Sequence, residues 1–254
     1  MNTFQTTLDD GTDAKPAQTS RRLSFNKRSG HAFTLIELLV VIGIIALLAG
    51  LVVGLTAYSA RKMREHRVRT ELDELVTAIE AYNAHFGHYP PDNVVSRNPL
   101  FVNPVTNQLF YELTGVIADD KGARFRSPSR QQWISSVTVK TSFNTEGFVN
   151  AGATDKDIKS FITLKSSQYR EISLSPGPDI EVLNVPVDWP RNDPRFPPPI
   201  NTTDPRVKQI NPNPWHYVST QPTNNPQGFD LWAEYVDGKK IKIICNWSKD
   251  ILER

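Results

Sequence analysis

The chain has 254 residues, a formal net charge of +2 and a mean hydropathy of −0.40, values typical of one globular domain with an added element or of two small domains. This charge does not indicate nucleic-acid binding, and the single cysteine, Cys245, excludes an intramolecular disulfide and a thiolate metal cluster within one chain. The sequence contains no serine-hydrolase, zinc-protease, phosphate-loop or dinucleotide-binding motif, so we expect a protein that is not an enzyme.

Residues 1–32 are polar, with five basic and three acidic side chains, and we expect a disordered cytoplasmic leader. The apolar run 33–58 follows. A membrane-spanning helix needs roughly 20 apolar residues, and this run exceeds that length. It is also longer than the apolar region of about 7–15 residues in a secretory signal. The sequence therefore predicts a single-pass anchor that starts at Phe33.

Glu37 is the only charged side chain inside the apolar run. A charge at mid-membrane is unfavourable by on the order of 2.5–3.5 kcal/mol, so we expect this carboxylate to have a partner. A cation would offset its desolvation. The alternative is that Glu37 lies at the level of the lipid headgroups of an ordinary anchor and has no further role.

Residues 33–41, FTLIELLVV, resemble the amino terminus of bacterial type IV pilins and type II secretion pseudopilins. In that family a prepilin peptidase removes a basic leader before the Phe and methylates the new amino group, and the Glu four residues on guides subunit docking. The resemblance implies cleavage between Ala32 and Phe33, methylation of Phe33, and docking through Glu37 to the amino group of a neighbouring subunit. The family usually has Gly before the cut, so the bond after Gly30 is the alternative.

Two glycines, Gly50 and Gly54, form a GxxxG spacing in the apolar run. This spacing can allow two helices to pack closely, and glycines without a packing role are the alternative.

The helical pattern continues beyond the apolar run. Residues 60–86 contain no proline or glycine, and their apolar side chains recur every three or four positions. Gly87 and the following prolines end the pattern. We predict one helix over 33–86, with a membrane-spanning half (33–58) and an amphipathic periplasmic half (59–87). The basic run 61–69 favours a solvated collar, with contact to anionic lipid as the alternative.

Residues 88–254 are predicted to form a periplasmic globular domain. Thr106 is expected to cap a short helix through Leu113 that ends at Gly115. Apolar runs predict strands, polar glycine-containing stretches predict connections, and dense proline predicts irregular chain. The strands are at 133–139, 161–164, 171–174 and 181–187, the connections at 118–130 and 141–159, and the irregular region at 186–226.

The end of the chain predicts an antiparallel hairpin. Alternating apolar runs at 229–235 and 241–247 flank Asp237-Gly238, and glycine accepts the positive φ of a tight turn. We expect the inner face of this hairpin to pack on the apolar stripe of the long helix. The predicted fold class is therefore α+β and pilin-like, with one long amino-terminal helix packed on a carboxyl-terminal antiparallel sheet.

Segments of the final region also resemble the major type II secretion pseudopilin: Asn213-Pro214-Trp215, Gly228–Trp232, Asp237-Gly238 and Asn246-Trp247. Major pseudopilins typically bind calcium in the last hairpin loop. Here that loop is reduced to residues 236–240, where two lysines flank one aspartate, whereas calcium prefers six to eight oxygen ligands. We expect no calcium and no other cofactor.

The resemblance implies a structural subunit of a type II secretion pseudopilus in the bacterial inner membrane, with its domain in the periplasm. Its partners would be further copies of itself, the prepilin peptidase, the inner-membrane assembly platform and minor pseudopilins, and not nucleic acid. Two alternatives stay open. One is a type IV pilin for adhesion, motility or DNA uptake, and the other is a single-pass anchored binding protein in which residues 93–212 recognise a ligand.

Overall fold

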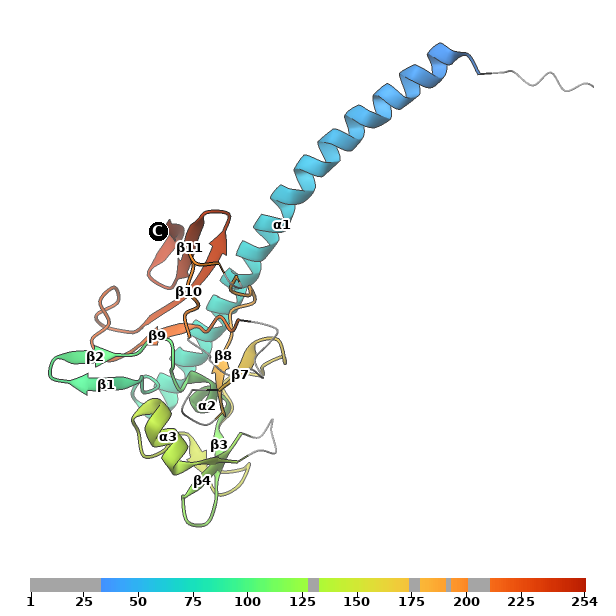
Figure 1. Cartoon of the computed structure of the whole chain (residues 1–254). Helices are drawn as coiled ribbons and strands as arrows, with labels where there is room; N and C mark the ends of the chain where they lie inside the picture. The colour runs from blue at the N-terminus through green and yellow to red at the C-terminus, as the bar shows by residue number, and fades with distance from the viewer. Residues whose placement is uncertain (1–32, 128–132, 174–178, 191–192, 201–210) are drawn as a thin grey trace, which may run out of the picture. The chain divides into compact units, whose positions relative to one another are not determined.

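A computed structural model describes residues 33–127, 133–173, 179–190, 193–200 and 211–254, without the side chains of 51–57 and Ser173 (Figure 1). The predicted leader 1–32, with Ala32 and Gly30, lies outside the described residues. The chain divides into one unit that ends at Val53 and a second from Gly54 to Arg254, and each is described by itself.

Helix α1 spans Leu35–Phe86 and has 52 residues. It confirms the prediction of one continuous helix, which begins two residues after Phe33. The helix ends at Gly87, whose φ of +78° suits glycine and whose N–H donates to Asn83 O over 2.8 Å. Within the described part of the chain, a helix of sufficient length and apolar character to span a bilayer is not found.

The part of α1 that belongs to the second unit, residues 54–86, is called the outer part here, and it carries the predicted apolar stripe. Its side chains are 0–3% exposed and belong to the main hydrophobic core: Val68, Leu72, Leu75, Ala78, Ile79 and Tyr82. The spacing of three and four places them on one helical face, which the globular part covers. Val76 and Phe86 pack against the same core and are partly buried.

A four-stranded antiparallel sheet contains the predicted hairpin. Its order is β12-β11-β10-β9, with bounds β9 His216–Val218, β10 Asp230–Asp237, β11 Lys240–Cys245 and β12 Ser248–Glu253. The hairpin of β10 and β11 is confirmed, with Asp237 paired to Lys240 around a turn at Gly238 (φ +67°). Two expectations are corrected: the hairpin is followed by β12, and β9 lies inside the region predicted to be irregular.

A second four-stranded sheet has the order β5-β4-β3-β6, in which only the β3–β6 pair is parallel. Its strands are β3 Val116–Ala118, β4 Arg124–Arg126, β5 Ile134–Ser135 and β6 Ala151–Gly152. Two antiparallel pairs complete the strands: β1 Val94–Arg97 with β2 Leu100–Val102, and β7 Tyr169–Ser173 with β8 Asp179–Leu183. The α+β class is confirmed, and β7 and β8 lie where two strands were predicted.

The strand predicted at 133–139 is wrong. Only β5 is extended there, and helix α3 follows at Ser136–Phe143. The Ser135 side chain accepts a hydrogen bond from the Thr138 N–H over 3.0 Å, which satisfies an unpaired donor of the first helical turn. This cap outweighs the strand preference of the β-branched residues in the segment.

Four further expectations are corrected. Residues 161–164 form no strand, and Phe161 N–H donates to Leu113 O at the end of α2 (Leu109–Thr114). Strand β4 lies inside 118–130, and β6 and the end of α3 lie inside 141–159. Thr106 does not cap α2; the Asn107 side chain accepts from Leu109 N–H over 3.3 Å instead.

Candidate functional site

The amino-terminal end of α1 contains a capping box formed by Thr34 and Glu37. The Thr34 N–H and hydroxyl both donate to Glu37 Oε2, over 2.9 and 2.8 Å, and the Glu37 N–H donates to Thr34 Oγ1 over 3.3 Å. This reciprocal pattern satisfies donors that a helix start leaves unpaired. Glu37 therefore has a partner within its own chain. The sequence signal for this capping box is the Thr-x-x-Glu spacing at residues 34–37.

The box does not depend on the residues before Phe33. Its backbone donors are the N–H groups of Thr34 and Glu37, so cleavage between Ala32 and Phe33 would leave its donors and acceptors intact. Phe33 is 80% exposed. A new α-amino group at Phe33 would thus form one residue away from the Thr34 N–H that holds the carboxylate.

The large apolar side chains from Leu35 to Leu48 are exposed on all sides of the helix. Exposure runs from 46% at Val41 to 81% at Leu35 for the large apolar residues 35–48. A helix that is apolar all round is usually covered by protein or by lipid. Apart from Gly50 itself, its chain neighbours and the adjacent backbone of its own helix, no described atom lies within 4 Å of the position that a Cβ would take there. Gly54 lies in 51–57, whose side chains are not described. Packing through Gly50 and Gly54 remains a prediction.

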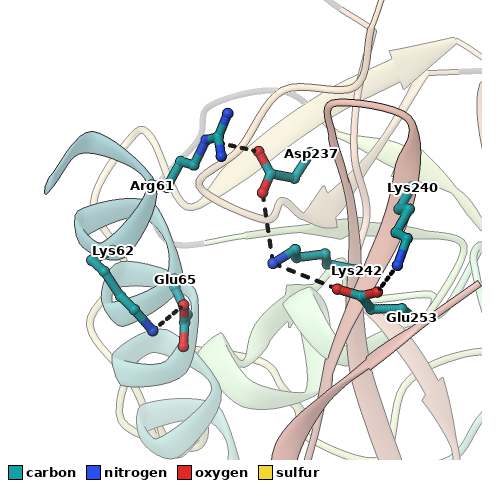
Figure 2. Close-up of polar contacts among 7 residues, drawn as sticks. All are labelled: Arg61, Lys62, Glu65, Asp237, Lys240, Lys242 and Glu253. Carbon is teal, nitrogen blue, oxygen red and sulfur yellow. Dashed lines mark hydrogen bonds and ion pairs between the residues drawn. The ribbon is translucent and has the colours of Figure 1, made fainter. Parts of the chain in front are cut away.

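A chain of ion pairs joins the outer part of α1 to the β10–β11 hairpin. Figure 2 shows Asp237 between two cations: Arg61 Nε lies 3.8 Å from Oδ1, and Lys242 Nζ lies 3.6 Å from Oδ2. Lys242 also contacts Glu253 over 3.8 Å, and Lys240 pairs with the same carboxylate. This pairing lowers the pKa of Glu253. The Asp237 carboxylate of the short hairpin loop is thus already shared between two basic side chains.

Arg69 provides a second link from α1 to the sheet. Its guanidinium donates to the backbone carbonyls of Ser248 (3.3 Å) and Lys249 (2.9 Å) at the start of β12. The acceptors are backbone atoms, which every residue type offers, so sequence reasoning had no signal for this contact.

Two buried carboxylates fix the helix to the globular part. Trp215 Nε1 donates to Glu71 Oε1 over 3.1 Å, and burial raises the pKa of Glu71 to about 7. Glu112, fully buried, accepts from the Tyr82 hydroxyl and from the N–H groups of Val149 and Asn150, each over 2.9 Å. Burial raises the pKa of Glu112 and of Tyr82. Neither carboxylate was identified from the sequence.

Charged side chains of both signs line one cavity of the second unit. A cavity of about 520 Å³ beside α1 is lined by three acids and three bases: Glu71, Glu74, Asp188, Arg67, Lys165 and Arg170. Within the described ranges, no group of three or more His, Cys, Asp or Glu side chains could hold a metal ion. His216 is buried and stacks on Trp232, with ring centroids 4.9 Å apart, and burial lowers its pKa to about 4.

Comparison with known proteins gives one result, at the amino terminus. Neither the curated proteins nor the solved structures gave a match to this chain. Residues 27–53 match the family model described as the prokaryotic N-terminal methylation motif. The matched segment contains Phe33, the capping box and the start of the exposed apolar helix. The match supports a type IV pilin-like family, and it suggests processing by a prepilin peptidase.

Proposed function

We propose that this protein is a pilin-like structural subunit that is processed by a prepilin peptidase and polymerised into a type II secretion pseudopilus. The observation that carries the proposal is the methylation-motif match at 27–53, which coincides with a capped helix start and an exposed apolar helix. The subunit acts by assembly and performs no chemistry of its own.

Processing creates the functional amino terminus. The peptidase cuts between Ala32 and Phe33 and methylates the new α-amino group. A small side chain at position 32 fits this role, although the family usually has glycine there. The motif match, which includes both residues, supports the assignment.

The apolar part of α1 holds the subunit in the bacterial inner membrane, with the globular domain in the periplasm. Residues 33–58 form this anchor. Its support is the exposure of at least 46% for every large apolar side chain from Leu35 to Leu48, since water is an unfavourable solvent for so much apolar surface.

Docking is an exchange of partners at Glu37. In the single chain the carboxylate accepts from Thr34; in the filament it pairs with the α-amino group of Phe33 in a neighbouring copy. An ion pair in low dielectric is stronger than a hydrogen bond to a neutral donor. The exchange therefore favours assembly only after cleavage has produced the amino group.

The choice of a secretion pseudopilus over a surface pilus rests on the resemblance at 213–247. The partners of such a subunit are the assembly platform and the minor pseudopilins. Deletion of the gene tests this choice. Loss of secreted enzymes with normal motility, adhesion and DNA uptake is expected; the reverse pattern would assign the subunit to a type IV pilus.

Mass spectrometry of the membrane-extracted protein tests the processing. In cells with an active prepilin peptidase, the mature chain should begin at Phe33 and carry one methyl group. Peptidase-deficient cells should retain the full leader. A chain that starts at His31 would move the cut to Gly30, and an unprocessed chain in peptidase-positive cells would overturn the proposal. A monomeric extracted protein that is never incorporated into filaments would favour an anchored binding protein.

A further inference from the structure

Basic side chains gather where the outer part of α1 meets the turn between β10 and β11. We define the basic collar as Arg61, Lys62, Arg64, Arg67 and Arg69 of α1 together with Lys239, Lys240 and Lys242 of the hairpin. The two groups are far apart in the sequence. The Arg61–Asp237 ion pair brings them together, as Figure 2 shows for part of the collar.

The collar has a large excess of positive charge. Its eight basic residues are accompanied by the carboxylates of Glu65, Asp237 and Glu253, and Arg67 also lines the cavity that contains Glu71 and Glu74, so the remaining excess of positive charge lies on the other collar residues. Each of the three acids already has a basic partner within the collar. Among the described residues Arg64 and Lys239 are exposed and have no ion-pair partner.

The collar is continuous in the chain with the exposed apolar helix. Arg61 lies three positions after the end of the apolar run 33–58, on the same helix. Basic side chains immediately beside a membrane-embedded helix meet the headgroups of the bilayer surface, and anionic headgroups attract them. A solvated collar would leave its excess positive charges to repel one another.

We propose that the basic collar binds the headgroups of anionic phospholipids, and that the hairpin lysines take part in this contact. The inference rests on the proposed membrane anchor and adds to it a lipid-binding surface on the globular part. Lys239 and Lys240 can reach the same surface as the helix arginines because the paired Asp237 holds the turn against α1. The sequence alone favoured a solvated collar; the contact of the hairpin turn with Arg61 is an observation of the structure.

Lysine labelling in nanodiscs tests the proposal with the full chain. The protein is reconstituted in discs of phosphatidylcholine alone and in discs that also contain phosphatidylglycerol, and acetylation rates of individual lysines are measured by mass spectrometry. Lys239 should react roughly threefold to fivefold more slowly in the anionic discs, and high salt should remove the difference. Lys121, in the turn between β3 and β4 at the other end of the globular part, is the internal control and should react equally (Figure 1).

A pair of matched variants adds a second readout. Arg64→Gln removes an unpaired charge of the collar and should reduce the protection of Lys239, whereas Arg97→Gln on β1 removes an exposed arginine outside the collar and should leave it unchanged.

Equal labelling of Lys239 in the two lipid compositions, with the chain retained in both discs, would overturn the lipid contact while leaving the anchor intact. Failure of the chain to be retained in either disc would overturn the proposed anchor and the lipid contact with it.

Discussion

The two ends of α1 share one continuous backbone and have opposite surroundings. Large apolar side chains from Leu35 to Leu48 are 46–81% exposed, whereas the apolar stripe from Val68 to Tyr82 is 0–3% exposed. The outer stripe finds its partners within the chain, in the globular part. The inner side chains are exposed within their own unit, and the proposed membrane anchor and filament would supply their partners. Helix periodicity alone does not distinguish the two cases, whereas the presence of one apolar stripe or of apolar residues all round does.

The largest effect is expected at the inner end. Glu37→Ala should still be processed and retained in membranes, but its incorporation into filaments should fall on the order of a hundredfold, because an ion-pair partner in low dielectric is lost. Crosslinking of sheared filaments measures incorporation. Glu65→Ala, which removes an exposed pair with Lys62 on the same helix, is the control and should assemble normally. Normal assembly of the Glu37 variant would remove the role we give this residue.

At the outer end the largest effect on stability is expected from Glu112→Ala. The substitution leaves the Tyr82 hydroxyl and the N–H groups of Val149 and Asn150 without their acceptor. We expect the free energy of unfolding to decrease by about 3–5 kcal/mol. Urea unfolding of the detergent-solubilised protein measures this. Asp73→Ala, an exposed acid of the same helix, should change stability by less than about 0.5 kcal/mol. A similar small change for Glu112 would show that the helix is not fixed there.

The free energy of unfolding should depend on pH through two buried groups, Glu71 of α1 and His216 of β9. Folding raises the pKa of Glu71 from 4.5 to about 7, so its stabilising contribution is full below pH 4.5 and is lost as the pH rises through 7. Folding lowers the pKa of His216 from 6.5 to about 4, so its contribution is full above pH 6.5 and is lost as the pH falls through 4. Each change amounts to at most about 3 kcal/mol.

The variant Glu71→Gln separates these two contributions. Glutamine still offers an oxygen to Trp215 Nε1 and does not titrate, so the decline between pH 5 and 8 should flatten while the loss on the acidic side remains. Thermal unfolding at each pH measures both. An unchanged profile above pH 5 would contradict the assignment to Glu71.

The smallest effect is expected for the Arg61–Asp237 pair. The Arg61 side chain is 65% exposed, and exposed ion pairs contribute about 0.2–1 kcal/mol. A double-mutant cycle with Arg61→Ala and Asp237→Ala should give a coupling energy in that range that decreases at high salt. A coupling energy above about 2 kcal/mol would contradict this expectation and would show that the pair stabilises the contact between hairpin and helix more than an exposed ion pair does.

The features that were predictable from the sequence are those with local periodicity. The long helix and its outer stripe follow from apolar residues spaced by three and four positions. The β10–β11 hairpin follows from apolar residues spaced by two positions on either side of Asp237-Gly238. The Thr34–Glu37 box was equally local and could have been found. At 133–139 a single cap at Ser135 reversed the preference of the residues that follow.

Most of the remaining contacts were not predictable because they join positions that are distant in the sequence through backbone atoms, which every residue type carries. Glu112 accepts from the backbone of Val149 and Asn150, and Arg69 donates to the carbonyls of β12. The position of the collar lysines likewise depends on a pairing between Arg61 and Asp237. A buried carboxylate in an apolar segment gives no sequence signal of its partners when these are peptide groups.

The arrangement around Glu112 also determines how the second unit responds to load. One carboxylate joins Tyr82 of α1 to two peptide groups of the globular part, and Glu71 joins the same helix to Trp215. Withdrawal of this helix segment would leave the Glu112 carboxyl group without Tyr82 and the Trp215 indole N–H without its acceptor. We therefore expect these contacts to transmit a force applied along this helix segment to the globular part.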